Sequence, residues 1–121
     1  MPVEYFSVER CYVTELYNTP SDAAVSVAKI RVEPGESTCW HRLKGISERY
    51  VLLSGQGIVE IDQNPPRALL PGDSALIAPN QPQRITNTGQ SDLEFLAICS
   101  PRFNEDAYED LEASGQYPAS R

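Results

Sequence analysis

One histidine and one glutamate are the residues of this chain best suited to acid–base chemistry. His41 is the only histidine, and Glu48 follows it by seven positions within a segment bounded by Gly35 and Gly55. Imidazole changes its charge near neutral pH, and a carboxylate in a mostly apolar strand must be hydrogen bonded, paired or protonated. We therefore predict that His41 and Glu48 lie on neighbouring strands and act as the catalytic pair.

Three further residues are candidates for binding a substrate. Tyr50 follows Glu48 at the two-residue spacing that places both on one face of a strand, so it is either a core residue or a pocket wall with a hydroxyl group. Gln83 carries an amide that can bridge Glu48 and His41 or contact a ligand. Cys39 precedes His41 by two positions on the same predicted face, where packing competes with chemistry as its role.

Composition limits the classes of partner. The 121 residues include 10 Lys and Arg against 17 Asp and Glu, which gives a net charge of −7. Nucleic acid and anionic membrane surfaces bind basic proteins, so neither is expected as a partner. No apolar run reaches the length of about 18 residues that a membrane span requires. A small-molecule ligand is therefore the expected partner.

The cysteines and the first residues indicate in which cellular compartment the protein is expected. Cys11, Cys39 and Cys99 are odd in number and widely spaced, which favours reduced thiols over a disulfide framework. The first residues lack the basic and apolar regions of a secretory signal. The chain is therefore expected to be cytoplasmic.

Short alternating segments separated by turns predict an all-β domain. Apolar and polar residues alternate within each segment, and Gly, Pro and Asn mark the turns between them. The predicted strands cover residues 24–32, 37–43, 48–54, 58–62, 74–78, 83–87 and 93–99. About seven or eight short strands at regular spacing are typical of a sandwich or barrel. We therefore predict one domain over residues 1–121, with its barrel core at about 24–100.

The two ends differ from this core. Residues 1–18 fit neither period and are predicted as a short extended or coil arm. Asn104 is a suitable helix N-cap, acidic residues follow it, and Gly115 is a suitable stop, so residues 104–113 are predicted as one short acidic helix. Residues 116–121 are predicted as a loose tail, which completes a C-terminal region of helix and tail over 104–121.

The segment around His41 resembles the first motif of the cupin superfamily, G(X)5HXH(X)3-4E(X)6G. Gly35, His41, Glu48 and Gly55 stand at the motif spacing, and Leu43 replaces the second histidine. The second motif, G(X)5PXG(X)2H(X)3N, is matched at its two ends. Its positions are occupied here by Gly72, Ala78, Asn80, Gln83 and Asn87.

The resemblance implies a fold and a ligand set. It implies a small antiparallel β-barrel of jelly-roll type with the motif residues lining its mouth. Family habit and exposed strand edges imply a homodimer. Family members commonly hold one divalent metal with the motif histidines and glutamate, and the corresponding positions here are His41, Leu43, Glu48 and Gln83. Leucine cannot ligate, so a metal such as Mn, Fe, Ni or Zn would have only His41, Glu48 and Gln83.

Three functions are compatible with these residues. We favour an enzyme without a tightly held metal, in which His41 acts as acid or base and Glu48 and Gln83 orient it. The resemblance to metal-independent sugar epimerases and a nucleoside-aldehyde dehydratase implies isomerase-, epimerase- or dehydratase-like chemistry on a carbohydrate-like or carbonyl-bearing metabolite. The second function is a metal-dependent dioxygenase or lyase, and the third is a ligand-binding module without catalysis.

Overall fold

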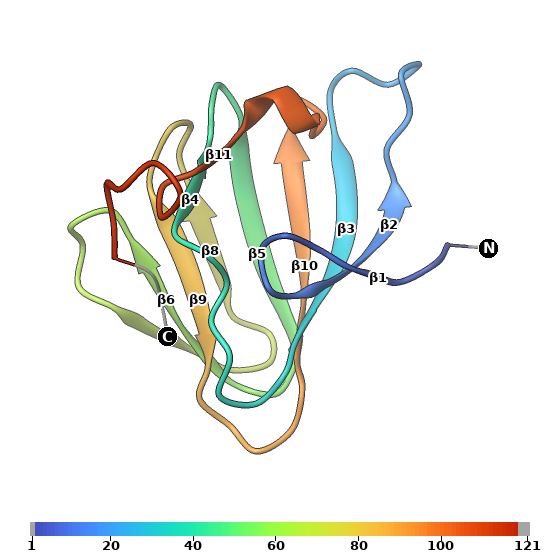
Figure 1. Ribbon diagram of the computed structural model, residues 1–121. Helices are drawn as coiled ribbons and strands as arrows, with labels where there is room; N and C mark the ends of the chain where they lie inside the picture. Colours follow the sequence, from blue (N-terminus) through green and yellow to red (C-terminus); the bar gives the residue numbers. More distant parts are fainter. Residues whose placement is uncertain (1, 119–121) are drawn as a thin grey trace.

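The structure, a computed structural model, describes residues 2–118, which form two antiparallel β-sheets facing each other (Figure 1). The first sheet has the strand order β1-β2-β3-β10-β5-β8. Its strands are β1 (Tyr5–Phe6), β2 (Tyr12–Tyr17), β3 (Ser26–Val32), β10 (Leu93–Ser100), β5 (Ser47–Ser54) and β8 (Ser74–Ile77). The predicted all-β barrel of jelly-roll type is confirmed.

The second sheet has the strand order β11-β4-β9-β6-β7. Its strands are β11 (Tyr108–Asp110), β4 (His41–Leu43), β9 (Gln83–Asn87), β6 (Gly57–Ile61) and β7 (Arg67–Leu69). The strands come from distant parts of the chain, since β4 lies between β11 and β9 and joins the C-terminal segment to the middle of the sequence.

Alternation of buried and partly exposed residues places the core between the sheets. Along β10, Leu93, Phe95, Ala97 and Cys99 are buried and the residues between them are not, as the two-residue repeat of a strand requires. The same repeat buries Val59 and Ile61 on β6 of the opposite sheet. The inward faces of both sheets therefore form one apolar interior.

Most predicted strands agree with the structure, and four strands were not predicted. β9 has the predicted bounds, while β5 and β10 are each one residue longer. The predicted strand over 37–43 is shorter, because only His41–Leu43 is regular and Ser37 forms an isolated bridge with Thr86. The strands missed by the sequence patterns are β1, β2, β7 and β11.

The predicted C-terminal helix over 104–113 is wrong. Asn104 does cap a helical turn, with its side chain accepting from the Ala107 N–H, but the turn is a 3-10 helix of only three residues, Glu105–Ala107. The chain then extends as β11 and pairs with β4. Pairing satisfies the backbone groups at the edge of β4, and an ion pair of 2.8 Å joins Arg42 to Glu109 across the two strands. Tertiary pairing thus overrides the local helix signal.

The predicted loose tail over residues 116–121 is only partly correct, because Tyr117 makes ordered contacts. Tyr117 stacks on Trp40 with ring centroids 4.5 Å apart, and its backbone N–H donates to the Leu111 carbonyl. This stacking helps to bury Trp40. Residues 119–121 lie outside the described residues.

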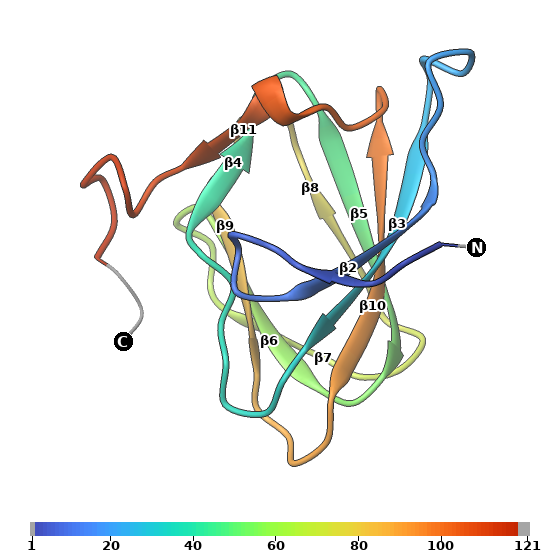
Figure 2. The same ribbon diagram turned by 45° about the vertical axis from the view of Figure 1, so that its right-hand side comes forward.

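The N-terminal arm folds into a hairpin that crosses one side of the interior (Figure 2). Between β1 and β2, Arg10 donates to both carboxylate oxygens of Glu112, each at 3.2 Å. One of these oxygens also accepts from the Trp40 backbone N–H at 2.8 Å. One glutamate therefore links the arm, the segment before β4 and the C-terminal region.

The described residues include no helix that is both long and apolar enough to cross a membrane.

The glycines at the ends of the first motif differ in their surroundings, and this difference predicts a stability ranking. Gly35 and Gly55 both have positive φ, at 79° and 82°. A Cβ on Gly55 would lie 2.5 Å from the Asp92 carbonyl oxygen, whereas a Cβ on Gly35 would meet nothing within 4 Å. We expect Gly35→Ala to lower the free energy of unfolding by about 1 kcal/mol through strain alone. Gly55→Ala should lower it by about 3 kcal/mol, because the backbone must also shift.

Urea unfolding of the two variants beside the unsubstituted protein measures this ranking. Equal losses of stability for both variants would contradict the close approach of Gly55 to Asp92.

Candidate active site

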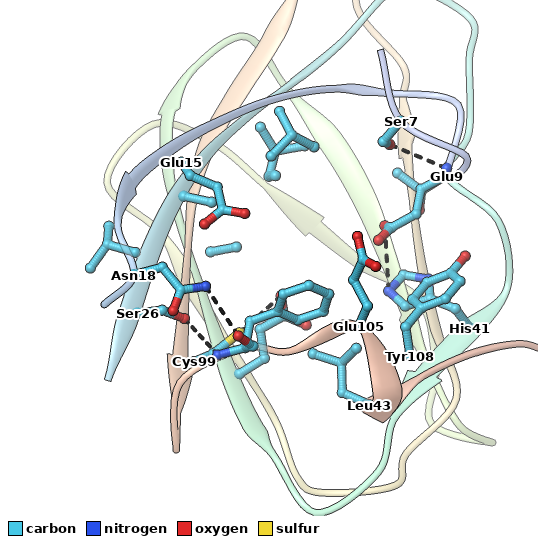
Figure 3. Close-up of a pocket in the computed structure, with 18 of the residues that line it drawn as sticks. Ser7, Glu9, Glu15, Asn18, Ser26, His41, Leu43, Cys99, Glu105 and Tyr108 are labelled. Atoms are coloured by element: carbon cyan, nitrogen blue, oxygen red, sulfur yellow. Dashed lines mark hydrogen bonds and ion pairs between the residues drawn. The ribbon is translucent and has the colours of Figure 1, made fainter. Parts of the chain in front are cut away.

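A cavity of about 480 Å³ lies inside the barrel and is bounded on one side by the N-terminal hairpin (Figure 3). Its walls are mainly apolar and include Ile30, Leu43, Phe95 and Phe103. The volume lies in the range of small-molecule sites, which combine apolar walls with a few polar groups. The polar groups include a cluster around His41, while Glu15, Asn18 and Ser26 lie on the opposite side of the cavity.

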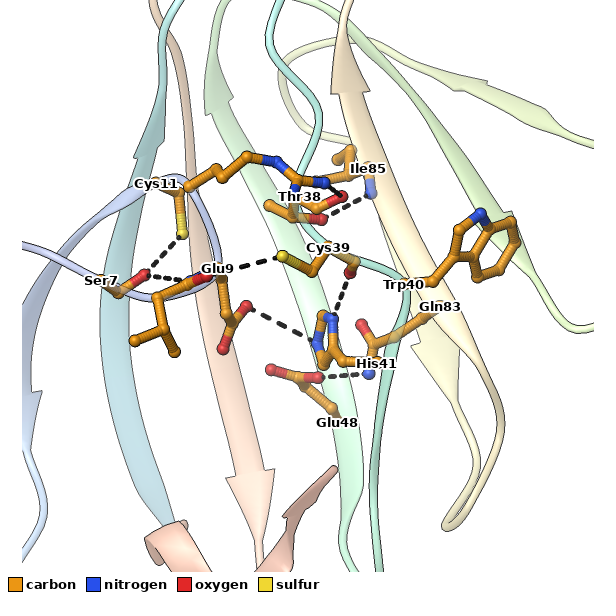
Figure 4. A network of polar contacts seen from close by, with 12 residues as sticks. Ser7, Glu9, Cys11, Thr38, Cys39, Trp40, His41, Glu48, Gln83 and Ile85 are labelled. Carbon is orange, nitrogen blue, oxygen red and sulfur yellow. Dashed lines mark hydrogen bonds and ion pairs between the residues drawn. The ribbon is translucent and has the colours of Figure 1, made fainter. Parts of the chain in front are cut away.

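His41 is held in one tautomer at the start of β4. Its side chain is 2% exposed, and its Nδ1 lies 2.7 Å from the Cys39 carbonyl oxygen. A carbonyl only accepts hydrogen bonds, so Nδ1 carries the proton of the neutral ring and Nε2 keeps a free lone pair. Nε2 lies 3.6 Å from a carboxylate oxygen of Glu9 (Figure 4). The ring also stacks on Tyr108, with centroids 5.3 Å apart.

Glu48 lies on β5 within a network of polar side chains. The Gln83 amide group donates to one of its oxygens at 2.8 Å, and the Tyr50 hydroxyl donates to the Gln83 carbonyl oxygen. The Cys99 thiol lies 3.8 Å from the other carboxylate oxygen. Figure 4 shows Glu48 and Gln83 beside the His41 ring. The network leaves each member with at least one partner.

Burial changes the acidity of Glu48. The residue is 7% exposed, and loss of hydration of the charged form raises its pKa from 4.5 to about 7. His41 and the Gln83 amide act in the opposite direction, and the nearby Glu9 carboxylate adds to the increase. Glu48 can therefore give or take a proton near neutral pH.

The predicted placement of His41 and Glu48 on neighbouring strands is wrong. β4 belongs to the second sheet and β5 to the first, so the two side chains approach each other across the interior. Gln83 is the residue directly opposite His41, in the pairing of β4 with β9. Closure of the barrel brings the three groups together, and spacing along the chain does not show which sheet a strand joins.

Of the other two residues predicted to bind substrate, Tyr50 lines the cavity and Cys39 does not. Tyr50 lines the cavity and packs its ring against Phe95 at 4.5 Å between centroids. Cys39 is buried, points its thiol at the Val8 carbonyl at 3.5 Å, and is not among the described residues that line the cavity. Burial raises the pKa of Cys39 to about 11, so its thiol stays protonated. Cys39 contributes its carbonyl oxygen, not its sulfur, to the site.

Two residues of the site were missed by the sequence patterns. Glu9 lies in the turn between β1 and β2, where the hairpin carries it to the His41 ring. Tyr108 begins β11, within the segment predicted as a helix, and its buried hydroxyl has no hydrogen-bond partner among the described residues. No local signal marks either residue, because both reach His41 through contacts between distant segments.

The donor set does not fit the metal that the motif resemblance implies. The carbonyl oxygen of Gln83 is occupied by Tyr50, and its amide group faces Glu48 as a donor. Leu43 stands at the position of the second histidine. Within residues 2–118, no group of three or more His, Cys, Asp or Glu side chains is arranged to hold a metal ion. The three proposed ligands bind each other or the backbone instead.

Comparison with known proteins places the chain in a family. The family model described as "Cupin domain" matches residues 28–99, and the chain therefore belongs to the cupin family. A protein of Thermotoga maritima named "Oxalate-binding protein" is 34% identical over 71 residues, which are 59% of this chain and 58% of that protein. The chain thus matches less than two thirds of that relative's length.

Solved structures share the fold. Oxalate decarboxylase from Bacillus subtilis superposes with a TM-score of 0.81 at 18% identity, over 97% of this chain and 32% of that chain. KdgF from Halomonas sp. superposes with a TM-score of 0.72 at 18% identity, over 84% of this chain and 89% of that chain. At these identities the likeness concerns the fold alone. Family membership and the cavity together define a small-molecule-binding protein of the cupin type.

The raised pKa of Glu48 predicts how stability depends on pH. Between pH 4.5 and about 7 the folded protein keeps a proton on Glu48 that the unfolded chain has lost. The free energy of unfolding should therefore fall as the pH rises through this interval and stop changing on this account above it. In Glu48→Gln this contribution is absent, so the decline should be shallower.

Denaturant unfolding at several pH values across this interval measures the slope. Glu33→Gln, at an exposed position away from the cavity, is the matched control and should retain the slope of the unsubstituted protein. Parallel slopes for Glu48→Gln and the unsubstituted protein would show that the pKa of Glu48 is not raised.

Proposed function

We propose that this protein binds a small carbohydrate-like or carbonyl-bearing metabolite and transfers a proton on it, in the manner of an isomerase, epimerase or dehydratase. The observation that carries the proposal is the pairing of two groups in one cavity. In its neutral form His41 presents the lone pair of Nε2, because Nδ1 faces the Cys39 carbonyl, and burial raises the pKa of Glu48 to about 7. Two titratable groups with different environments supply the base and the acid that such a reaction requires.

In this proposal the two groups have separate tasks. His41 Nε2 takes the proton from the carbon next to the carbonyl, and the Glu9 carboxylate at 3.6 Å stabilises the resulting imidazolium. The Cys39 carbonyl keeps the ring oriented throughout, because Nδ1 stays protonated in both charge states. Glu48, in its protonated form, donates to the carbonyl oxygen on which negative charge develops. The carbonyl oxygen takes the proton of Glu48 to form an enediol. His41 then delivers its proton to the former carbonyl carbon while the neighbouring hydroxyl returns a proton to Glu48, and this completes an isomerisation.

The Gln83 amide and the Tyr50 hydroxyl position the acid. Tyr50 fixes the Gln83 carbonyl, and this leaves the amide group directed at Glu48. Mutual fixing of this kind keeps a buried carboxyl group in one orientation. Gln83 is a positioning residue, since it is not among the described residues that line the cavity, whereas Tyr50 positions Gln83 and also lines the cavity.

Proton transfer at carbon predicts exchange with solvent, which tests the proposal before the substrate is known. Sugars, sugar nucleotides and keto acids incubated in D₂O with the protein can be followed by proton NMR. We expect deuterium to enter the position next to the carbonyl of at least one compound. Loss of the base in His41→Gln, or of the acid in Glu48→Gln, should slow exchange by about 10² to 10⁴-fold.

Glu33→Gln serves as the control variant and should exchange at the rate of the unsubstituted protein. If bound compounds exchange no faster than in buffer, the protein is a ligand-binding module, the function that the name of the Thermotoga maritima relative suggests.

Metal content distinguishes the proposal from a metal-dependent dioxygenase or lyase. Untagged protein purified without chelators should contain far less than one Mn, Fe, Ni or Zn per chain, because the donor set described above is incomplete. The same measurement on His41→Ala is the control. Near-stoichiometric metal in the unsubstituted protein, lost in His41→Ala, would replace the proposed function by a metal-dependent one.

We also propose that the protein is a cytoplasmic homodimer joined through the N-terminal hairpin. β1 is the last strand of the first sheet, and apolar side chains beside it are exposed, with Phe6 at 60% and Leu16 at 48%. An edge strand with exposed apolar residues favours pairing with a second copy. The three cysteines are free and buried, as suits a reducing compartment.

Sedimentation analysis tests the dimer. Leu16→Lys alters the exposed face without touching the cavity and should shift the protein towards monomer, whereas Leu76→Lys on β8 should not. A protein that is monomeric at all concentrations would refute the dimer.

A further inference from the structure

The charge of the cavity wall is uniform in sign. Among residues 2–118, the cavity is lined by four glutamates and by no lysine or arginine. Glu48 is buried, Glu9 is partly exposed, and Glu15 and Glu105 are exposed at the rim. Figure 3 shows Glu9, Glu15 and Glu105 arranged around the same opening. A ligand entering the site therefore passes several carboxylates.

Cations close to the site in the sequence are engaged elsewhere. The Arg10 guanidinium, next to Glu9, donates to Glu112 and to the carbonyls of Ser37 and Thr38. Arg102 is not among the described residues that line the cavity, and its guanidinium donates at 2.7 Å to Asn18, which is. The ion-pair partner of Glu9 is His41, which is charged only when protonated. The negative charge of the cavity is therefore largely uncompensated.

The carboxylates of the cavity also affect the pKa values of two neighbouring tyrosines. Burial raises the pKa of the Tyr108 phenol, and the Glu9 carboxylate raises it further. Burial also raises the pKa of Tyr50, and Glu48 and Glu9 add to the increase. A negative field opposes the formation of a further anion, whether a phenolate or a bound carboxylate.

The uncharged part of the wall is rich in aromatic rings. In the described part of the chain, six aromatic residues line the cavity: Tyr5, Phe6, Tyr50, Phe95, Phe103 and Tyr108. Aromatic faces attract cations, and organic ammonium groups are often held by rings together with carboxylates. Tyr108 also has a buried hydroxyl with no hydrogen-bond partner among the described residues.

We propose that the ligand is an organic cation, a carbohydrate-like or carbonyl-bearing metabolite with a protonated amine. The inference rests on the proposed function in that the same cavity holds the substrate. A metal ion does not satisfy the negative charge, because no group of three metal-ligating side chains exists in the described part of the chain. A dicarboxylate such as oxalate would meet repulsion from Glu9 and, at the rim, from Glu15 and Glu105. The site thus selects a ligand of opposite charge to the one named for the Thermotoga maritima relative.

Ligands that share one ring and differ in charge test the proposal. Calorimetric titration at low salt with glucosamine, glucose and glucuronate compares one sugar ring as amine, neutral compound and acid. Benzylamine, benzyl alcohol and benzoate repeat the comparison on an aromatic ring. In at least one series the amine should bind about tenfold more tightly than the neutral compound, as a charge-assisted hydrogen bond allows, and the acid should bind most weakly.

Substitutions of the lining glutamates test whether the preference for amines arises in the cavity. Glu9→Gln and, at the rim, Glu105→Gln should each remove much of the preference for the amine. Glu33→Gln changes the net charge equally at an exposed position outside the cavity and should leave the preference intact. Tighter or equal binding of the neutral compound or the acid, no binding of either amine at millimolar concentration, or an equal effect of Glu33→Gln would overturn the proposal.

The two proposals fail in different ways. Preferred binding of the amines without deuterium exchange in any compound would remove the catalytic function and keep the charge selectivity. Deuterium exchange in neutral or acidic compounds, with no preference for amines, would keep the catalysis and remove the selectivity.

Discussion

The burial of a carboxyl group inside an apolar barrel is the constraint on which the site depends. An unpartnered polar group in such a place costs on the order of 1–3 kcal/mol, and a charged one costs more. Gln83 and Tyr50 meet this requirement for Glu48 through a chain of two hydrogen bonds. The same burial raises the pKa of Glu48 to about 7, so the feature that demands a supporting network also provides the acid–base group.

The end segments of the described chain complete the site. The N-terminal hairpin carries Glu9 to the His41 ring, and β11 brings Tyr108 against its face. Glu112 holds these segments in register by accepting from Arg10 and from the Trp40 backbone. Because Trp40 directly precedes His41, the contacts that fix the end segments also fix the strand that begins at His41. Stability of the barrel wall and geometry of the site are thus coupled.

A few side chains distinguish this site from the metal-binding pattern of the family. Leucine at position 43 removes one imidazole, and glutamine at position 83 replaces another by an amide. The amide can donate and accept at once, so it bridges Tyr50 and Glu48 where an imidazole would bind metal. Leu43 instead contributes to the apolar wall. The scaffold is unchanged, and the chemistry it supports is decided by such substitutions.

The sequence by itself determined the all-β class, the family and the residues at the centre of the site. Alternation along strands such as β9 and β10 shows which residues face inward, because side chains on a strand repeat every two residues. Positive φ at Gly35 and Gly55 explains why glycine marks the motif ends. His41, Glu48 and Gln83 could be chosen because polar groups are unusual at inward positions.

Only the tertiary structure decided to which sheet each of those residues belongs and which side chains surround it. The sheet assignment of β4 and β5, the arrival of Glu9 and the pairing of β11 all depend on contacts between distant segments. Local propensity favoured a helix after Asn104, but the open edge of β4 offered backbone hydrogen bonds to an extended chain. The negative charge of the cavity is likewise a tertiary property, since its four glutamates come from three separate segments, the N-terminal hairpin, β5 and the 3-10 turn.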